Sequence, residues 1–122
     1  MSAPRLLVIS GPIASGKSTV AGVLAAELRA DGHGAMVVDL DRMYMMLDDT
    51  SPMDDSNTWR AARRGAAALT NQFPQDGLEL VIVEGTFWTE SDRTDYTNCL
   101  ATGLEPVFVT LRVAVDEAQR RV

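Results

Sequence analysis

The stretch LLVISGPIASGKSTVAGVLAAEL, residues 6–28, places glycine, proline and lysine between an apolar run and a helix-like run. The continuous apolar run predicts a buried strand over residues 6–10. A helix follows, with one side formed by Val20, Val23, Leu24 and Leu28 and an end at Gly32 or Gly34. Between strand and helix the chain satisfies the pattern G-x-x-x-x-G-K-[ST] at Gly11, Gly16, Lys17 and Ser18.

This pattern predicts a phosphate-binding loop. Glycines permit a backbone path on which successive N–H groups point inward, and the helix N-terminus adds partial positive charge. Lys17 is expected to reach the β- and γ-phosphates, and Ser18 offers its hydroxyl to Mg²⁺. The residues expected to hold the phosphates of ATP are Gly11, Ile13, Ala14, Ser15, Gly16, Lys17, Ser18 and Thr19.

Outward from this stretch, apolar runs alternate with helix-period runs. Three further strands are expected over residues 36–40, 78–83 and 107–112, where Val, Ile and Phe dominate. A second helix is expected from Trp59 to Phe73, and a third from a capping pair, Thr89 and Asp92, to Gly103. The third helix would turn Tyr96, Cys99 and Leu100 inward. This alternation predicts an α/β fold with a parallel sheet, and residues 48–56, rich in Asp, Ser and Pro, are expected to form a mobile loop.

The C-terminal residues begin another helical period, at Val115, Ala118 and Val122, that the sequence does not complete. We therefore expect residues 1–122 to be one nucleotide-binding domain that continues, or once continued, into a further strand.

Composition excludes several classes of function. The 122 residues are 46% hydrophobic, enough for one globular core, and carry a net charge of −6, which disfavours a nucleic-acid or anionic-membrane partner. A lone cysteine, Cys99, permits no internal disulfide. No apolar run reaches the roughly 20 residues of a membrane span, and Gly11 and Pro12 interrupt any signal-peptide core. We expect a cytoplasmic protein.

Acidic residues follow two of the expected strands, at the edge where ligands of open α/β sheets bind. Asp39 and Asp41, at a spacing of two, would aim the same way, one accepting a hydroxyl proton and the other supporting a metal ion. The alternative is that they cap the next helix or turn. Glu84, followed by Gly85, ends the third strand in the position of an acidic metal partner, or simply forms a strand-end turn. Gly85 would let a substrate approach closely.

The acceptor side is less determined by the sequence. Arg60, Arg63 and Arg64 share a helical face, which either binds an anionic acceptor or is a solvated basic surface. Phe87 and Trp88 either wall an acceptor pocket or pack as core, with core packing slightly favoured. The same alternatives hold for the apolar run Met43, Tyr44, Met45, Met46 and Leu47. His33 is expected in an exposed turn.

Together, the segments GPIASGKS, DLD, VIVEG and PVFVTLRVAVDEAQRRV resemble the small-molecule kinases of the phosphate-loop superfamily: shikimate, gluconate and adenylylsulfate kinases and chloramphenicol phosphotransferase. The resemblance implies a three-layer α/β/α P-loop NTPase fold with strand order 2-3-1-4-5, the last strand being absent from this chain. It also implies that Asp41 is the base that acts on the acceptor and that Asp39 lies near the metal. The family's arginine-bearing lid and adenine-binding loop would lie beyond Val122.

The sequence therefore favours an ATP- and Mg²⁺-dependent phosphotransferase acting on a hydroxyl of a small molecule. Lys17 and Asp41 would act in transfer, while Ser18, Asp39 and Glu84 would support the metal. Acceptor contacts would come from Asp41, Arg60, Arg64 and Gly85. The alternatives are a nucleotide-binding module without turnover, a zeta-toxin-like kinase of a nucleotide sugar, and an RNA-end kinase, which the acidity disfavours. A GTPase is disfavoured because the chain has no Asn-Lys-x-Asp motif.

Overall fold

The computed structural model describes residues 5–12 and 16–112. Four parallel strands form one sheet in the order β2-β3-β1-β4. They are β1 (Arg5–Ser10), β2 (Ala35–Asp39), β3 (Leu80–Gly85) and β4 (Pro106–Thr110). This order confirms the first four positions of the expected 2-3-1-4-5 sheet and the α/β fold class, with each strand boundary within two residues of the expected one.

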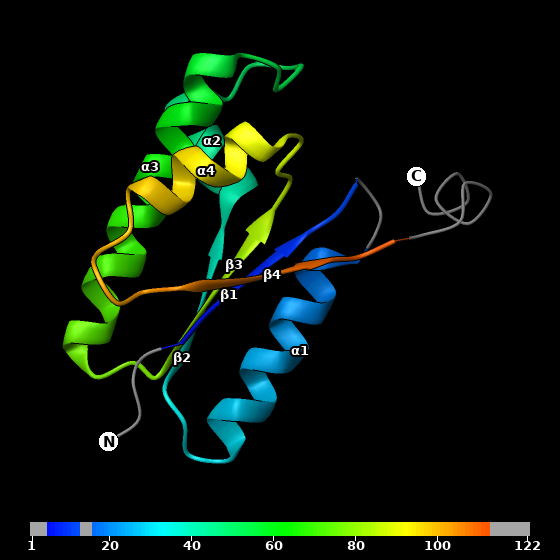
Figure 1. Cartoon of the computed structure of the whole chain (residues 1–122). Coiled ribbons are helices and arrows are strands. Elements are labelled where there is room, and N and C mark those ends of the chain that lie inside the picture. The colour runs from blue at the N-terminus through cyan, green and yellow to red at the C-terminus, as the bar shows by residue number, and fades with distance from the viewer. Residues whose placement is uncertain (1–4, 13–15, 113–122) are drawn as a thin grey trace.

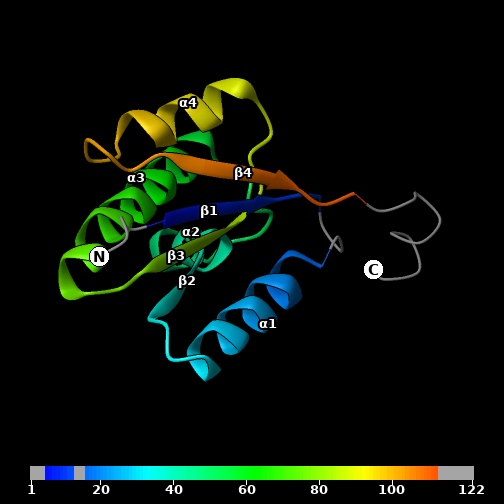
Figure 2. The same ribbon diagram turned by 60° about the horizontal axis from the view of Figure 1, so that its bottom comes forward.

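Helices cover both faces of the sheet, so the domain has three layers (Figures 1 and 2). Of the helices within residues 5–12 and 16–112, α1 (Lys17–Ala30) covers one face. The opposite face carries α2 (Leu40–Leu47), α3 (Ser56–Gln72) and α4 (Glu90–Asn98), with a short 3₁₀ turn, η1 (Phe73–Asp76), after α3.

The two faces are packed with different side chains. Ala21 and Ala25 of α1 lie directly against Ile9 and Ile82 of the sheet, so small residues let this helix approach closely. The α2–α3–α4 face instead buries large rings, Tyr44, Trp59 and Tyr96 among them. The expectation that Val20 and Val23 belong to the packed side of α1 is wrong, because these side chains are 42% and 54% exposed.

Local signals set where the helices begin and end. The capping box at Thr89 and Asp92 is confirmed: Asp92 N donates to Thr89 Oγ1 at 3.1 Å, and the Asp92 carboxylate accepts from Thr89 N at 3.1 Å. Tyr96 is buried, and Cys99 and Leu100 pack against the core as expected. The helix ends at Asn98, however, and Gly103, with a φ of 93°, shapes the later turn instead.

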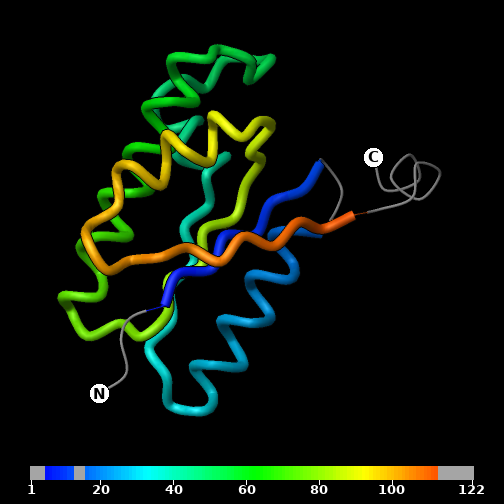
Figure 3. The backbone as a smooth tube through the Cα atoms, in the orientation of Figure 1, coloured from blue at the N-terminus to red at the C-terminus, as the bar shows by residue number. Residues whose placement is uncertain are grey.

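The connection between α2 and α3 has no regular secondary structure from residue 48 to residue 55, which Figure 3 shows as a long excursion at one end of the molecule. Two contacts tie it to the helices: Asp55 N donates to Tyr44 Oη at 3.0 Å, and Trp59 Nε1 donates to Met53 O at 2.8 Å. These bonds fix the segment beside the carboxyl ends of the strands.

In the described part of the chain, residues 5–12 and 16–112, no helix combines the length and apolarity that a bilayer crossing requires.

Candidate functional site

The phosphate loop begins where β1 ends, at the carboxyl edge of the sheet. Gly16 adopts a left-handed conformation, with a φ of 93°, immediately before α1 starts at Lys17. The first N–H groups of α1 therefore have no acceptor within the helix and face the loop. Gly11 and Thr19 lie at its two ends, whereas Ile13, Ala14 and Ser15 lie outside the described residues.

Lys17 is buried within the loop although it carries a charge: its residue is 8% exposed, and its Nζ donates to Pro12 O at 3.2 Å. One carbonyl hydrogen bond satisfies only part of an ammonium group with three donors. Within residues 5–12 and 16–112, no carboxylate forms an ion pair with Lys17.

Glu84 is connected to this loop directly. Ser18 Oγ donates to Glu84 Oε1 at 2.9 Å, across 66 residues of sequence. Burial raises the pKa of Glu84 to about 7, and the charges of Asp39 and Asp41 add to this effect, while the Ser18 hydrogen bond opposes it. The β2–β3 register places Asp39 opposite Glu84. The motif's serine and the strand-end acids therefore meet at one edge.

Asp39 and Asp41 do not extend one strand, as the spacing argument assumed. Asp39 is the N-cap of α2: its Oδ1 accepts from Asp41 N at 3.0 Å and Arg42 N at 3.3 Å. Because this cap starts a helix, Asp41 lies in the first turn of α2. The capping alternative is correct for Asp39, and it brings Asp41 into electrostatic reach of Lys17.

Asp41 is partly buried at this edge. Burial raises its pKa, the Asp39 charge raises it further, and Lys17 counteracts both. A carboxylate that senses the phosphate-loop lysine and is a stronger proton acceptor than a solvent-exposed aspartate has the properties of a base for an acceptor hydroxyl.

Gly85 brings β3 and α2 into close contact. A Cβ added at Gly85 would lie 2.5 Å from Leu40 Cβ, closer than side-chain atoms approach in proteins. The immediate neighbour of Gly85 is therefore Leu40, and the absence of a side chain at Gly85 allows α2 to pack closely on β3. A direct substrate contact at Gly85 stays a prediction.

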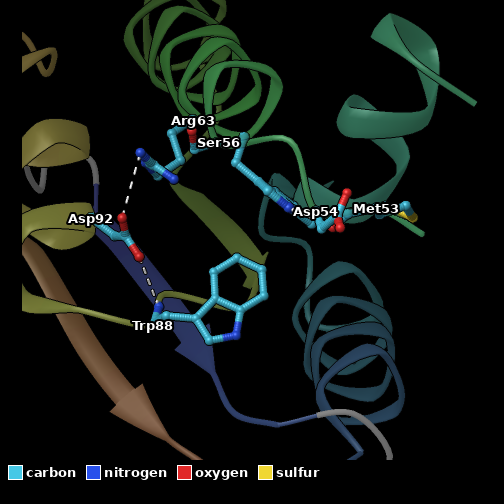
Figure 4. Close-up of a pocket in the computed structure, with 7 residues that line it drawn as sticks. Met53, Asp54, Ser56, Arg63, Trp88 and Asp92 are labelled. Atoms are coloured by element: carbon cyan, nitrogen blue, oxygen red, sulfur yellow. Dashed lines mark hydrogen bonds and ion pairs between the residues drawn. The ribbon is translucent and has the colours of Figure 1, made fainter. Parts of the chain in front are cut away.

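A cavity of about 320 Å³ lies between α3, the α2–α3 connection and the β3–α4 turn (Figure 4). Its lining residues are Met53, Asp54, Ser56, Trp59, Arg63, Trp88 and Asp92. Thr86 Oγ1 donates to Gly11 O and Phe87 N donates to Ser10 Oγ, both at 3.3 Å, so the β3–α4 turn is tied to the start of the phosphate loop. Trp88, which lines the cavity, therefore follows directly on a segment that is bonded to the start of the loop.

The basic face of α3 was expected either to bind an anionic acceptor or to be a solvated surface, but its three arginines lie in different environments. Arg63 is buried, with its residue 7% exposed, and lies among the core residues of α3, where it pairs with Asp92 and Asp95 of α4 at 3.5 Å. Arg60 and Arg64 are half-exposed and pair with Asp95 at 3.7 Å. Helical spacing alone did not reveal that α4 supplies a carboxylate partner. Neither Arg60 nor Arg64 lines the cavity, and their contact with an acceptor stays a prediction.

The aromatic and methionine residues divide between core and surface. Phe87 is core, while Trp88 is 60% exposed and lines the cavity. Met43 and Tyr44 pack in the core, whereas Met45, Met46 and Leu47 are exposed. Sequence reasoning did not select Met53, Asp54 or Ser56 as cavity residues, because the α2–α3 connection and the start of α3 carry no motif, and it identified Asp92 only as a helix-capping residue. His33 lies in its exposed turn as expected, 2.7 Å from Glu79.

The side chains at the proposed metal position are those of Ser18, Asp39 and Glu84. Each offers oxygen atoms, which are the ligands that Mg²⁺ prefers. Among residues 5–12 and 16–112, no group of three His, Cys, Asp or Glu side chains is arranged to hold a metal ion. Ser18, Asp39 and Glu84 fit a magnesium ion that also takes phosphate and water oxygens, which is how Mg²⁺ usually binds beside nucleotides.

A family model described as an AAA domain matches residues 6–122. No curated protein sequence matches. Among solved structures, one similar chain is the APS kinase CysC of Mycobacterium tuberculosis, determined with AMPPNP and APS. The two structures match with a TM-score of 0.84 at 21% sequence identity, and the match covers 99% of this chain and 69% of the CysC chain.

A sugar kinase of Janibacter has a TM-score of 0.73 at 18% identity over 98% of this chain and 66% of that one. A chain of the Pnkp1/Rnl/Hen1 complex matches with a TM-score of 0.72 at 18% sequence identity. That match covers 97% of this chain and 38% of the chain in the complex. These comparisons confirm the phosphate-loop α/β fold and the resemblance to small-molecule kinases. The chain spans about two thirds of the two kinase chains.

Proposed function

Because the chain belongs to the AAA domain family, and because its phosphate loop and acidic strand ends share one edge of the sheet, we propose that it is an ATP-dependent phosphotransferase with a small-molecule acceptor. In this proposal the γ-phosphoryl group passes from ATP to a hydroxyl group. A cytoplasmic location, where ATP is available, accords with it.

The phosphate side is supported by the left-handed Gly16, the free amides of the first turn of α1 and the buried Lys17. Lys17 offsets the negative charge of the β- and γ-phosphates and of the transition state. Ser18, Asp39 and Glu84 would hold a Mg²⁺ ion beside the phosphates, and the ion would supply further neutralisation of that charge.

The acceptor side is supported by Asp41. Its raised pKa makes it a better acceptor for the hydroxyl proton than an exposed aspartate, and its interaction with Lys17 places it beside the phosphate loop. Glu84 accepts from the Ser18 hydroxyl, Asp39 lies opposite Glu84 in the neighbouring strand, and neither residue lines the cavity.

The single observation that carries this proposal is the Ser18–Glu84 hydrogen bond of 2.9 Å. It joins the loop that defines nucleotide-binding proteins to an acidic strand end, an arrangement that a simple glycine-rich turn does not need.

The test measures ADP release from Mg·ATP in the presence of a panel of hydroxylated metabolites and antibiotics. The wild type should release ADP only when an acceptor is present, and Asp41→Asn should reduce this rate by roughly 10²–10⁴-fold, the range for losing a general base. ATP binding by Asp41→Asn should stay close to that of the wild type, because Asp41 acts on the acceptor.

Equal loss of ATP affinity in Asp41→Asn and Lys17→Ala would contradict these roles. ATP binding without ADP release against the whole panel would favour a nucleotide-binding module without turnover.

A further inference from the structure

The cavity beside the β3–α4 turn has a wall of two indoles. Trp59 is held in place: its Nε1 donates to Met53 O at 2.8 Å, and its ring lies 4.5 Å from the Tyr44 ring. Trp88 meets Trp59 edge-on at 5.1 Å and leaves 60% of its surface exposed. Figure 4 shows the Trp88 ring standing at the opening of the cavity, opposite Asp54 and Met53.

Such an arrangement suits a flat ring. Two indoles at nearly right angles give an incoming ring one face to stack on and one edge to meet. The volume of about 320 Å³ lies at the lower end of the range for small-molecule sites, so the occupant is small.

The charged residues that line the cavity determine which charged groups a bound ring can carry. Among the described residues that line the cavity, Arg63 is the one cation, and its guanidinium forms ion pairs with Asp92 Oδ1 and Asp95 Oδ2 at 3.5 Å each. The Asp54 carboxylate also lines the cavity. An anionic ligand would therefore meet a cation whose charge is compensated, together with two carboxylates.

The position of the cavity relates it to the reaction. Tyr44, which packs on Trp59, lies one helical turn after Asp41 on α2. The other wall is tied to Gly11 through Thr86. Two lining residues therefore connect the cavity to the proposed reaction site: Trp59 packs on the helix of the proposed base, and Trp88 follows the segment bonded to the phosphate loop.

Resting on the proposed phosphotransferase function, we propose that this cavity is the acceptor site and that it selects a small hydroxylated molecule with an aromatic or flat apolar ring and no anionic group. Trp88 and Trp59 bind the ring. Asp92, by compensating Arg63, excludes acceptors that carry a carboxylate or phosphate.

The test uses three probes that share a phenyl ring and a hydroxyl group: 2-phenylethanol, which is neutral, 2-amino-1-phenylethanol, which is cationic, and 3-phenyllactate, which is anionic. Binding to the full chain is measured by ligand-observed NMR titration without nucleotide. The neutral and cationic probes should bind at least about tenfold more tightly than 3-phenyllactate, because only the latter meets the carboxylates.

Two variants assign the effect. Trp88→Ala should weaken 2-phenylethanol binding by about fivefold or more, while Trp88→Phe, the matched control, stays within about twofold of the wild type. Asp92→Asn keeps an oxygen for the α4 capping bonds but removes the charge, so 3-phenyllactate should bind this variant about threefold or more tighter than the wild type.

Tighter binding of 3-phenyllactate than of 2-phenylethanol by the wild type would overturn the proposal. So would saturable binding of none of the three probes, or unchanged binding in Trp88→Ala. Because no nucleotide is present, these outcomes are separate from those of the transfer assay: ring binding without ADP release would contradict the phosphotransferase function and leave the selectivity of the cavity standing.

Discussion

The phosphate loop and the cavity lie at the same edge of the sheet, yet they are encoded in different ways. The loop is one continuous stretch between β1 and α1, and its key contact beyond that stretch is with Glu84. The cavity is assembled from the α2–α3 connection, α3 and the β3–α4 region. A backbone-built anion site needs a fixed local sequence, whereas a side-chain-built pocket needs only the right surfaces brought together.

The two regions also treat charge differently. In the loop, buried Lys17 donates to Pro12 O and forms no ion pair with a carboxylate among the residues that the structure describes. In the cavity, buried Arg63 is compensated by Asp92 and Asp95. The comparison teaches that a buried cation marks an anion site only when the fold has not already supplied its partner, and the predictions below test this difference.

The largest expected effect is on the cavity side. Arg63→Met leaves Asp92 and Asp95 without their buried partner and should reduce the free energy of unfolding by about 4 kcal/mol. Arg60→Met, which removes a half-exposed cation from the same Asp95, should cost well under about 1 kcal/mol. Urea denaturation of both variants measures the difference. Similar losses in the two would show that Arg63 is no more than a surface cation.

On the loop side, Glu84 should make the stability of the metal-free protein depend on pH. Its pKa is raised from 4.5 to about 7 in the folded state, so the folded protein binds the proton more tightly than the unfolded chain does. The resulting stabilisation is complete below about pH 4.5 and is lost as the pH rises through about 7, with an upper bound of roughly 3 kcal/mol.

Glu84→Gln should therefore flatten the fall in unfolding free energy between pH 5 and pH 8 when denaturation is measured in the presence of a chelator. An unchanged pH dependence in this variant would show that the Glu84 carboxyl is not held in the low-dielectric position that its contacts with Ser18 and Asp39 indicate.

A smaller effect on stability is expected at the contact between β3 and α2. Gly85→Ala places a Cβ 2.5 Å from Leu40 Cβ and should destabilise the fold by about 2 kcal/mol through overpacking. Gly22→Ala, within α1 and with no atom near its added Cβ, should instead stabilise by about 0.5–1 kcal/mol. Thermal denaturation compares the two, and equal shifts would contradict the tight β3–α2 contact.

The positions of the strands and of the loop were predictable because both depend on local signals, whereas the order of the strands came from the resemblance to the small-molecule kinases. Apolar runs mark β1 and β3, and glycine spacing marks the loop, so neither needs knowledge of distant partners. The capping box at Thr89 is equally local and was equally predictable. Asp39 shows the limit: its spacing to Asp41 fits a strand or a cap, and only the observed bonds to Asp41 N and Arg42 N decide for the cap.

The surroundings of the cavity residues were harder to predict because their contacts cross the fold. Arg63 meets Asp92 from another helix, 29 positions later in the sequence, and helical periodicity on α3 carries no information about α4. Trp88 and Phe87 are adjacent in sequence but separate into surface and core at the turn after β3. Val20 and Val23 fit the period of α1, yet the sheet is met by Ala21 and Ala25, since small side chains allow the closest packing.

The most direct test of the central claim, that the loop before α1 grips the phosphates of a nucleotide, is a calorimetric titration with AMPPNP and Mg²⁺. The account predicts saturable binding at one site in the wild type, about a hundredfold or more weaker binding in Lys17→Ala, and wild-type affinity in Trp88→Ala. Absence of binding heat in the folded wild type, or equal affinity in Lys17→Ala and the wild type, would contradict it.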